Sequence, residues 1–205
     1  MKFIRINLLY YLIISHILAE ETSSYQLPVF NVSRAMGSIT IDGHLDDEGW
    51  QSTNVINNFL EVMPGENIPP IVRTEAFVTY DSKNFYVAIK CYDDPKNIRA
   101  QISKRDRIYN DDYAGFYIDT YGDANRAVEF QVNALGIQGD SQTVGTNEDQ
   151  SFDMIFSSAG IITEEGYQVE VAVPFSSLRF PDKEEQTWRF SVFRSLPRND
   201  FKRKM

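Results

Sequence analysis

The sequence predicts an all-β protein, an antiparallel β-sandwich of the jelly-roll kind with few or no long helices after the N-terminal segment. Three observations support this fold class. Apolar residues recur at every second position in several short segments, which is the period of a half-buried strand. Turn-forming residues separate these segments at short intervals. Aromatic residues make up 13% of the 205 residues, and long stretches with the helical period of 3.6 are absent, as expected of a sandwich.

The predicted strands follow from this alternation, taken in chain order. Residues 38–41 run into Asp42-Gly43, which favours a strand that ends in a tight turn. The next two alternating segments are separated by four polar residues and read as a hairpin. The last four strands end mostly at aspartate, glycine or proline, which commonly terminate strands. The segments after 38–41 are residues 72–80, 85–91, 114–118, 128–134, 167–173 and 188–192.

The connecting segments are predicted from their turn chemistry. Residues 46–52 favour one helical turn near Trp50, and residues 175–178 favour another after a proline. Residues 63–70 hold three prolines and a glycine, so a loop is expected there. Residues 136–150 are polar and rich in glycine, which predicts a long loop.

The N-terminus has the layout of a secretory signal peptide. Lys2 and Arg5 precede an apolar run, and Ala19 is followed abruptly by acidic and polar residues. The expected organisation is therefore a signal peptide, an N-terminal extension, one sandwich domain and a tail. These cover residues 1–19, 20–35, 36–198 and 199–205. A secreted, periplasmic or cell-envelope location is expected, with membrane contact only through the export signal or a further C-terminal region.

Composition excludes several function classes. The formal net charge of −9 repels phosphate backbones, so nucleic acid is not an expected partner. The single cysteine, Cys91, rules out an internal disulfide and a cysteine-based metal site. Two histidines leave little for histidine catalysis. Neutral ligands and hard cations such as Ca²⁺ remain open.

A series of short motifs, in this order, resembles carbohydrate-binding module family 9. The resemblance is closest to the variant at the N-terminus of secreted bacterial proteins that continue into an outer-membrane-type β region, and it covers about residues 36–198. The motifs are Ile39 to Trp50, Thr79-Tyr80-Asp81, Arg105-Asp106, Asp111-Asp112, Phe116 to Thr120, Phe130 to Gly136, Asp140, Gly166 to Glu170, Val173 to Phe180 and Trp188 to Arg194.

The resemblance implies a β-sandwich with non-catalytic binding of poly- or oligosaccharides, linked to polysaccharide breakdown. It also implies structural Ca²⁺, with ligands unassigned among several acidic clusters. Sugar binders of this family hold a sugar between two tryptophans. Trp50 and Trp188 lie beside period-two strands, so both are predicted to be mostly buried in the core of a monomer.

Five residues are candidates for carbohydrate contact. Tyr109 offers a flat ring in a polar loop, with Arg105 and Asp112 as hydrogen-bonding neighbours. Glu129 and Glu170 lie on the polar faces of their strands and would form one polar patch if the strands were neighbours. Two such carboxylates would also suit glycoside hydrolysis, which is the enzymatic alternative. A third reading is a structural cap of a larger envelope protein without sugar affinity.

Overall fold

The computed structural model describes residues 29–198 and 201–205, with the backbone alone for residues 201–203. The predicted signal peptide, residues 1–19, lies outside the described residues. Val32–Met205 form one compact unit, and the fold described below is that of this unit. In the described part of the chain, no helix has both the length and the apolar character needed to cross a membrane.

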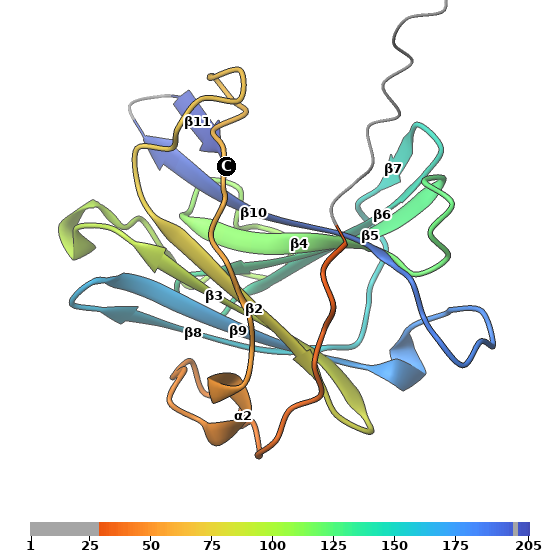
Figure 1. The fold of residues 1–205 in the computed structure, drawn as a ribbon. Helices are drawn as coiled ribbons and strands as arrows, with labels where there is room; N and C mark the ends of the chain where they lie inside the picture. The colour runs from red at the N-terminus through yellow and green to blue at the C-terminus, as the bar shows by residue number, and fades with distance from the viewer. Residues whose placement is uncertain (1–28, 199–200) are drawn as a thin grey trace, which may run out of the picture. The chain divides into compact units, whose positions relative to one another are not determined.

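Two antiparallel sheets face one another across one core, which confirms the predicted β-sandwich (Figure 1). The first has five strands in the order β1-β2-β3-β9-β8 and the second six in the order β11-β10-β4-β5-β6-β7. The strands of the first sheet are β1 Val55–Ile56, β2 Thr74–Tyr80, β3 Asn84–Tyr92, β8 Ser157–Thr163 and β9 Gly166–Pro174. Those of the second are β4 Tyr113–Asp119, β5 Arg126–Asn133, β6 Gln138–Val144, β7 Asn147–Asp149, β10 Arg189–Arg198 and β11 Phe201–Lys204.

The core forms because alternate residues of both sheets point toward each other. Val87 of β3 and Val171 of β9 pack against Phe116 of β4 and Phe130 of β5, and all four are at most 1% exposed. The rings of Phe116 and Phe130 stack with centroids 4.8 Å apart. Each such side chain contributes about 1.5–3 kcal/mol through burial, so the two sheets are held mainly by this layer.

Helices are few and short, as predicted. The described chain contains α2 Glu48–Gln51 and two single 3-10 turns, η1 Pro95–Asn97 and η2 Phe175–Ser177. The 72–80 and 85–91 hairpin is confirmed as β2 and β3, with Tyr80 opposite Phe85 at its turn. Trp50 is buried, at 5% exposed, whereas Trp188 is only partly buried and packs against Phe85 at the edge of the core.

Three local predictions are wrong. Residues 38–41 form no strand; instead this segment leads into α2, which contacts β2 of the five-stranded sheet. Residues 136–150 are not a loop but contain β6 and β7, which pair with each other and, through β6, with β5. The tail after residue 198 includes β11, which pairs with β10. Strand β8 was not predicted at all.

The reason for the error at β6 is a buried ion pair. The residue of β6 opposite Phe130 is Asp140, whose side chain is fully buried and bound by Arg105. A charged residue therefore occupies an inward position that normally carries an apolar side chain, and glycine and serine flank it. The alternation of apolar residues that marks the other strands is lost in β6.

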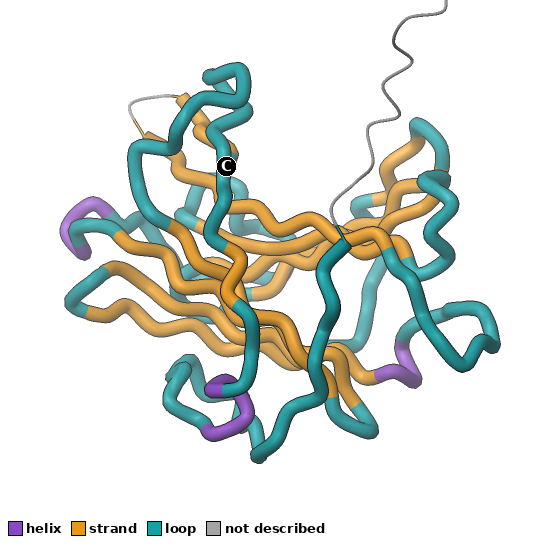
Figure 2. The backbone as a smooth tube through the Cα atoms, in the orientation of Figure 1, coloured by secondary structure: helices purple, strands orange, loops and turns teal. Residues whose placement is uncertain are grey.

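Loop residues between β1 and β2 extend to the second sheet. Figure 2 shows this segment in teal, rising from β1 toward the C-terminus and returning to β2. Val62 N–H donates to the carbonyl of Lys204 at 2.9 Å, and Lys204 N–H donates to the carbonyl of Met63 at 2.9 Å. These bonds place residues 62 and 63 beside β11.

Candidate functional site

The outer face of the six-stranded sheet carries a groove. In β4, β5 and β6, the residues that alternate with the core side chains point away from it. The register places Tyr117 opposite Glu129, and Glu129 opposite Ser141. A cavity of about 270 Å³ opens over these strands. This tyrosine groove is lined by Tyr109, Tyr113, Tyr117, Glu129, Gln131, Thr143, Glu148, Gln150 and Lys204.

Gln131 forms the floor of the tyrosine groove. Its neighbours across the strands are Gly115 and Gly139, which carry no side chain that could cover it. Gln131 is 2% exposed, yet its side-chain oxygen has no hydrogen-bond partner in the described part of the chain. A buried amide oxygen without a partner costs about 1–3 kcal/mol, so a residue in the cavity wall carries an unsatisfied acceptor.

A carboxylate and hydroxyl groups surround this floor. Glu129 is 6% exposed and accepts a hydrogen bond from Ser141 Oγ at 3.1 Å. Burial, together with the nearby charge of Glu129, raises the pKa of the Tyr117 hydroxyl well above its ordinary value. Burial first and Glu129 second also raise the pKa of Tyr109. At neutral pH these hydroxyls therefore stay protonated and can both donate and accept hydrogen bonds.

Tyr109 stands at the rim of the groove because its loop is anchored at both ends. Its ring meets that of Tyr113 edge to face, with centroids 6.3 Å apart. On one side, Arg105 binds Asp140 and donates to Gln138 Oε1 at 2.7 Å. On the other, Asp112 accepts from the Arg99 N–H at 2.9 Å. The loop's charged residues thus hold it on the fold, and its tyrosine faces the groove.

The structure therefore separates the five predicted site residues. Tyr109 and Glu129 both line the groove. Arg105 and Asp112 lie outside its wall, in contacts that hold the loop. Glu170 is distant from all four, in the other sheet.

Glu170 holds the opening Asp-Gly motif on the five-stranded sheet. Its carboxylate accepts from the N–H groups of Asp42 at 3.0 Å and Gly43 at 2.7 Å, and from Trp50 Nε1–H at 2.8 Å. Glu170 lies on the face of β9 that points away from the shared core, just as Glu129 does on β5. The two carboxylates consequently lie on outer faces of different sheets, so the condition for a shared polar patch is not met and Glu129 and Glu170 do not form a pair suited to glycoside hydrolysis.

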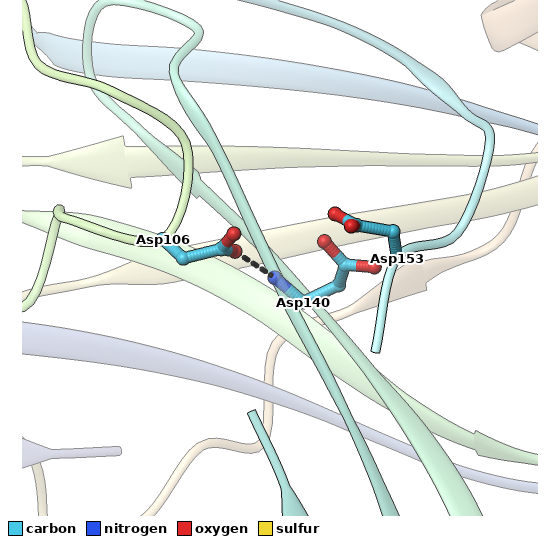
Figure 3. A group of neighbouring side chains, drawn as sticks. All are labelled: Asp106, Asp140 and Asp153. Carbon is cyan, nitrogen blue, oxygen red and sulfur yellow. Dashed lines mark hydrogen bonds between the residues drawn. The ribbon is translucent and has the colours of Figure 1, made fainter. Parts of the chain in front are cut away.

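One group of acidic side chains in the described chain converges as metal ligands would. Asp106, Asp140 and Asp153 each offer a carboxylate oxygen within 4.8 Å of the others (Figure 3). Arg105 already forms ion pairs with all three, including one to Asp153 at 3.2 Å. Asp140 also accepts from the Met154 N–H at 2.6 Å. The guanidinium takes the place that a cation would need, so this cluster does not fit a resident Ca²⁺.

Other acidic side chains accept hydrogen bonds in turns or form ion pairs. Asp119 accepts from the N–H groups of Tyr121, Gly122 and Ala124, which closes the turn after β4. Asp93 pairs with Arg194 and Arg198. These contacts satisfy the carboxylates within the fold.

Chelation should leave the thermal stability of the wild-type protein unchanged, because Arg105 neutralises the aspartate cluster. Differential scanning calorimetry with and without EDTA checks this. An Arg105→Met variant supplies the control, since Ca²⁺ should then raise its melting temperature through the three uncovered carboxylates. A drop in the wild-type melting temperature on chelation would show that a cation is held elsewhere.

Sequence reasoning missed the floor and one wall of the groove. Gln131, Tyr113 and Tyr117 are not among the five residues predicted to contact a carbohydrate. A signal existed, because these tyrosines alternate with Ala114, Phe116 and Ile118 and must therefore share the outer face.

A two-sheet sandwich that presents an aromatic and polar groove on one sheet is the architecture of a β-sandwich binding module. A family model described as "Carbohydrate family 9 binding domain-like" matches residues 41–193, and the chain belongs to this family. The resemblance seen in the motifs is thereby confirmed. A search of curated proteins gave no match.

Solved structures share the fold. A proposed carbohydrate-binding protein from Bacteroides uniformis ATCC 8492 superposes with a TM-score of 0.65 at 13% identity, over 85% of this chain and 88% of that one. A family 9 carbohydrate-binding module from Caldicellulosiruptor kristjanssonii in complex with cellotriose gives 0.59 at 16% identity, over 85% and 83%. A family 9 carbohydrate-binding module from Caldicellulosiruptor kristjanssonii in complex with glucose gives 0.56 at 15% identity, over 85% and 84%.

Proposed function

We propose that this chain is a non-catalytic carbohydrate-binding module whose ligand lies in the tyrosine groove. The observation that carries the proposal is the buried, unpartnered side-chain oxygen of Gln131 in the floor of a cavity walled by three tyrosines. Membership of the family and the likeness to modules solved with cellotriose and glucose support it.

The chemistry of the groove suits a neutral polyol. A sugar hydroxyl can donate to the Gln131 oxygen and to the Glu129 carboxylate, which replaces hydrogen bonds to water in a buried place. The Tyr109 ring at the rim can cover the apolar C–H face of a pyranose ring. A sugar is therefore held by polar groups below and by an aromatic ring at the side, without any need for a charge on the ligand.

Binding should be weak, since Tyr109 and Tyr113 meet edge to face and do not form a parallel pair that could clamp a ring. One aromatic platform adds about 0.5–1.5 kcal/mol beyond burial, with aromatic pairs taken as an analogue. We expect a dissociation constant in the high micromolar range or weaker, or about −5 kcal/mol.

Isothermal calorimetry with mono- and oligosaccharides tests the proposal. Wild type should bind at least one sugar, and Tyr109→Ala should weaken binding several-fold because the rim platform is lost. Tyr121→Ala is the matched control, since Tyr121 is 42% exposed and lies outside the groove. Equal affinity of wild type and Tyr109→Ala would place the site elsewhere. Failure of wild type to bind any sugar of a broad panel would favour the structural-cap reading.

Sugar affinity should be constant from about pH 7 to pH 9.5, because the pKa values of Tyr109, Tyr113 and Tyr117 are all raised and their hydroxyls stay protonated. Since these pKa values are higher in the folded than in the unfolded chain, their contribution to stability is present below pH 10 and is lost above it. Calorimetric titrations at several pH values check this. An affinity that falls by pH 9 would show that a hydroxyl ionises there.

The cellular location of the module and its biological role are also part of the proposal. The basic and apolar pattern of residues 1–19 supports export to the cell envelope or beyond. A monomeric module that binds a sugar without cleaving it would hold an attached enzyme close to its polysaccharide. In this way the module would take part in polysaccharide breakdown. Incubation with plant and microbial glycans should release no reducing ends.

A further inference from the structure

A second cavity adjoins the tyrosine groove. It measures about 490 Å³ and shares Tyr117 and Lys204 with the groove, so the two cavities lie side by side. Its origin lies in the sheet pairing. β11 pairs with residues 195–198 of β10 and Met205 bonds to Arg194, so within the described residues no strand pairs with residues 190–193 on that side. The segment 56–62 borders this gap.

The two cavities differ in their chemistry. The described wall of the tyrosine groove holds tyrosines and polar side chains only. The second cavity, here called the aliphatic lobe, has four polar side chains among thirteen, namely Asn58, Asn67, Ser191 and Lys204. Its remaining wall is apolar apart from the Tyr117 hydroxyl, with the aliphatic side chains Ile56, Leu60, Val62, Val192 and Met205 beside Phe59, Phe190 and Phe193.

The aliphatic lobe remains exposed to solvent at its rim. Leu60 is 47% and Val62 is 53% exposed, so apolar surface is available for burial by a ligand. An unsubstituted sugar ring would bring hydroxyl groups against aliphatic side chains that cannot accept or donate, which is unfavourable. A hydrocarbon group would lose only its contact with water.

We propose that the ligand is a glycoside that carries an apolar substituent, such as an acyl or alkyl group. Its sugar lies in the tyrosine groove and its substituent lies in the aliphatic lobe. Tyr117 stands where the sugar meets the substituent, because it lines both cavities. This inference rests on the proposed function and names the class of ligand that the two cavities together fit.

The test compares methyl and hexyl β-D-glucosides, with the matching galactosides and mannosides, by NMR titration of the labelled full chain. The hexyl chain is short enough to remain monomeric. Burial of its five additional methylenes should tighten binding at least about tenfold over the methyl glycoside. The signals of Leu60 and Val62 should shift with the hexyl compound alone.

A Leu60→Ser, Val62→Thr double variant should lose this gain and keep the methyl-glycoside affinity, since both side chains are half exposed and not part of the core. Ile71→Thr is the matched control, as Ile71 is 59% exposed and lies outside the lobe.

Three results would overturn the inference, and they differ in whether the proposed sugar site is kept. If methyl glycosides bind and the hexyl chain adds nothing, the aliphatic lobe has no such role and the sugar site stands. If cellobiose gains as much as the hexyl compound, the lobe takes a second sugar ring. If no glycoside of either series binds, the inference and the proposed function fall together.

Discussion

Replacement of Glu170 by leucine is expected to lower the free energy of unfolding by about 3–5 kcal/mol, the largest stability effect foreseen for this domain. Glu170 is fully buried, and its carboxylate accepts from the N–H groups of Asp42, Gly43 and the Trp50 indole. Leucine has a similar volume but would leave three donors without an acceptor, two of them, Gly43 N–H and Trp50 Nε1–H, in buried hydrogen bonds. Burial raises the pKa of Glu170, so the cost of desolvating the carboxylate offsets part of what these bonds contribute.

Urea unfolding followed by tryptophan fluorescence measures this effect. Glu170→Gln should be intermediate, because the amide oxygen still accepts hydrogen bonds but carries no charge. Glu129→Gln is the matched control on the other sheet and should cost less, since the partners of Glu129 are side-chain hydroxyls, Ser141 Oγ at 3.1 Å and Tyr117, to which an amide can still hydrogen-bond. Equal costs at both positions would contradict the structural role assigned to Glu170.

The second large effect is expected on binding. Gln131→Met should weaken sugar affinity by about ten- to a hundredfold, which corresponds to the loss of about 1.4–2.8 kcal/mol from one buried hydrogen-bonding group. Its stability should be close to that of wild type or slightly higher. The reason is that the Gln131 side-chain oxygen has no partner in the described structure, so the thioether removes an unsatisfied group and little else.

Calorimetric titration and urea unfolding of the same variant separate these two effects. Gln142→Met offers a control on the neighbouring strand, because Gln142 is only partly buried and lies outside the groove wall. A Gln131→Met protein that binds sugar as wild type does would remove the observation on which the proposed site depends. A marked loss of stability would indicate a structural role for the amide instead.

Much of the fold could be predicted from the sequence because the signals for β2, β3, β4, β5 and β9 are local. Their alternating apolar residues end at turn residues, and that pattern needs no knowledge of neighbours. The β6 strand could not be predicted in this way. Its inward position is taken by Asp140, and only the fold brings Arg105 beside it.

The candidate site could also be predicted only in part, because it too depends on long-range pairing. Glu129 and Glu170 have the same local pattern, an acidic residue between apolar ones on a strand. The strand order separates them onto different sheets, and that order depends on long-range pairing. The hydrogen bond from the Trp50 indole to Glu170 joins positions 120 residues apart, and no local sequence pattern predicts it. Tyr109 was predictable as a candidate because a flat aromatic ring in a polar loop can stack on a sugar, and the structure places it in the groove wall.

The most direct test of the central account is an NMR titration of the labelled protein with a sugar that calorimetry has shown to bind. We predict that the largest shifts fall on the Gln131 side-chain amide and on the ring signals of Tyr109 and Tyr117, with the Trp50 indole unaffected. Shifts that cluster around Trp50 and the Asp42-Gly43 turn, with the groove signals unmoved, would contradict the assignment of the binding site to the tyrosine groove.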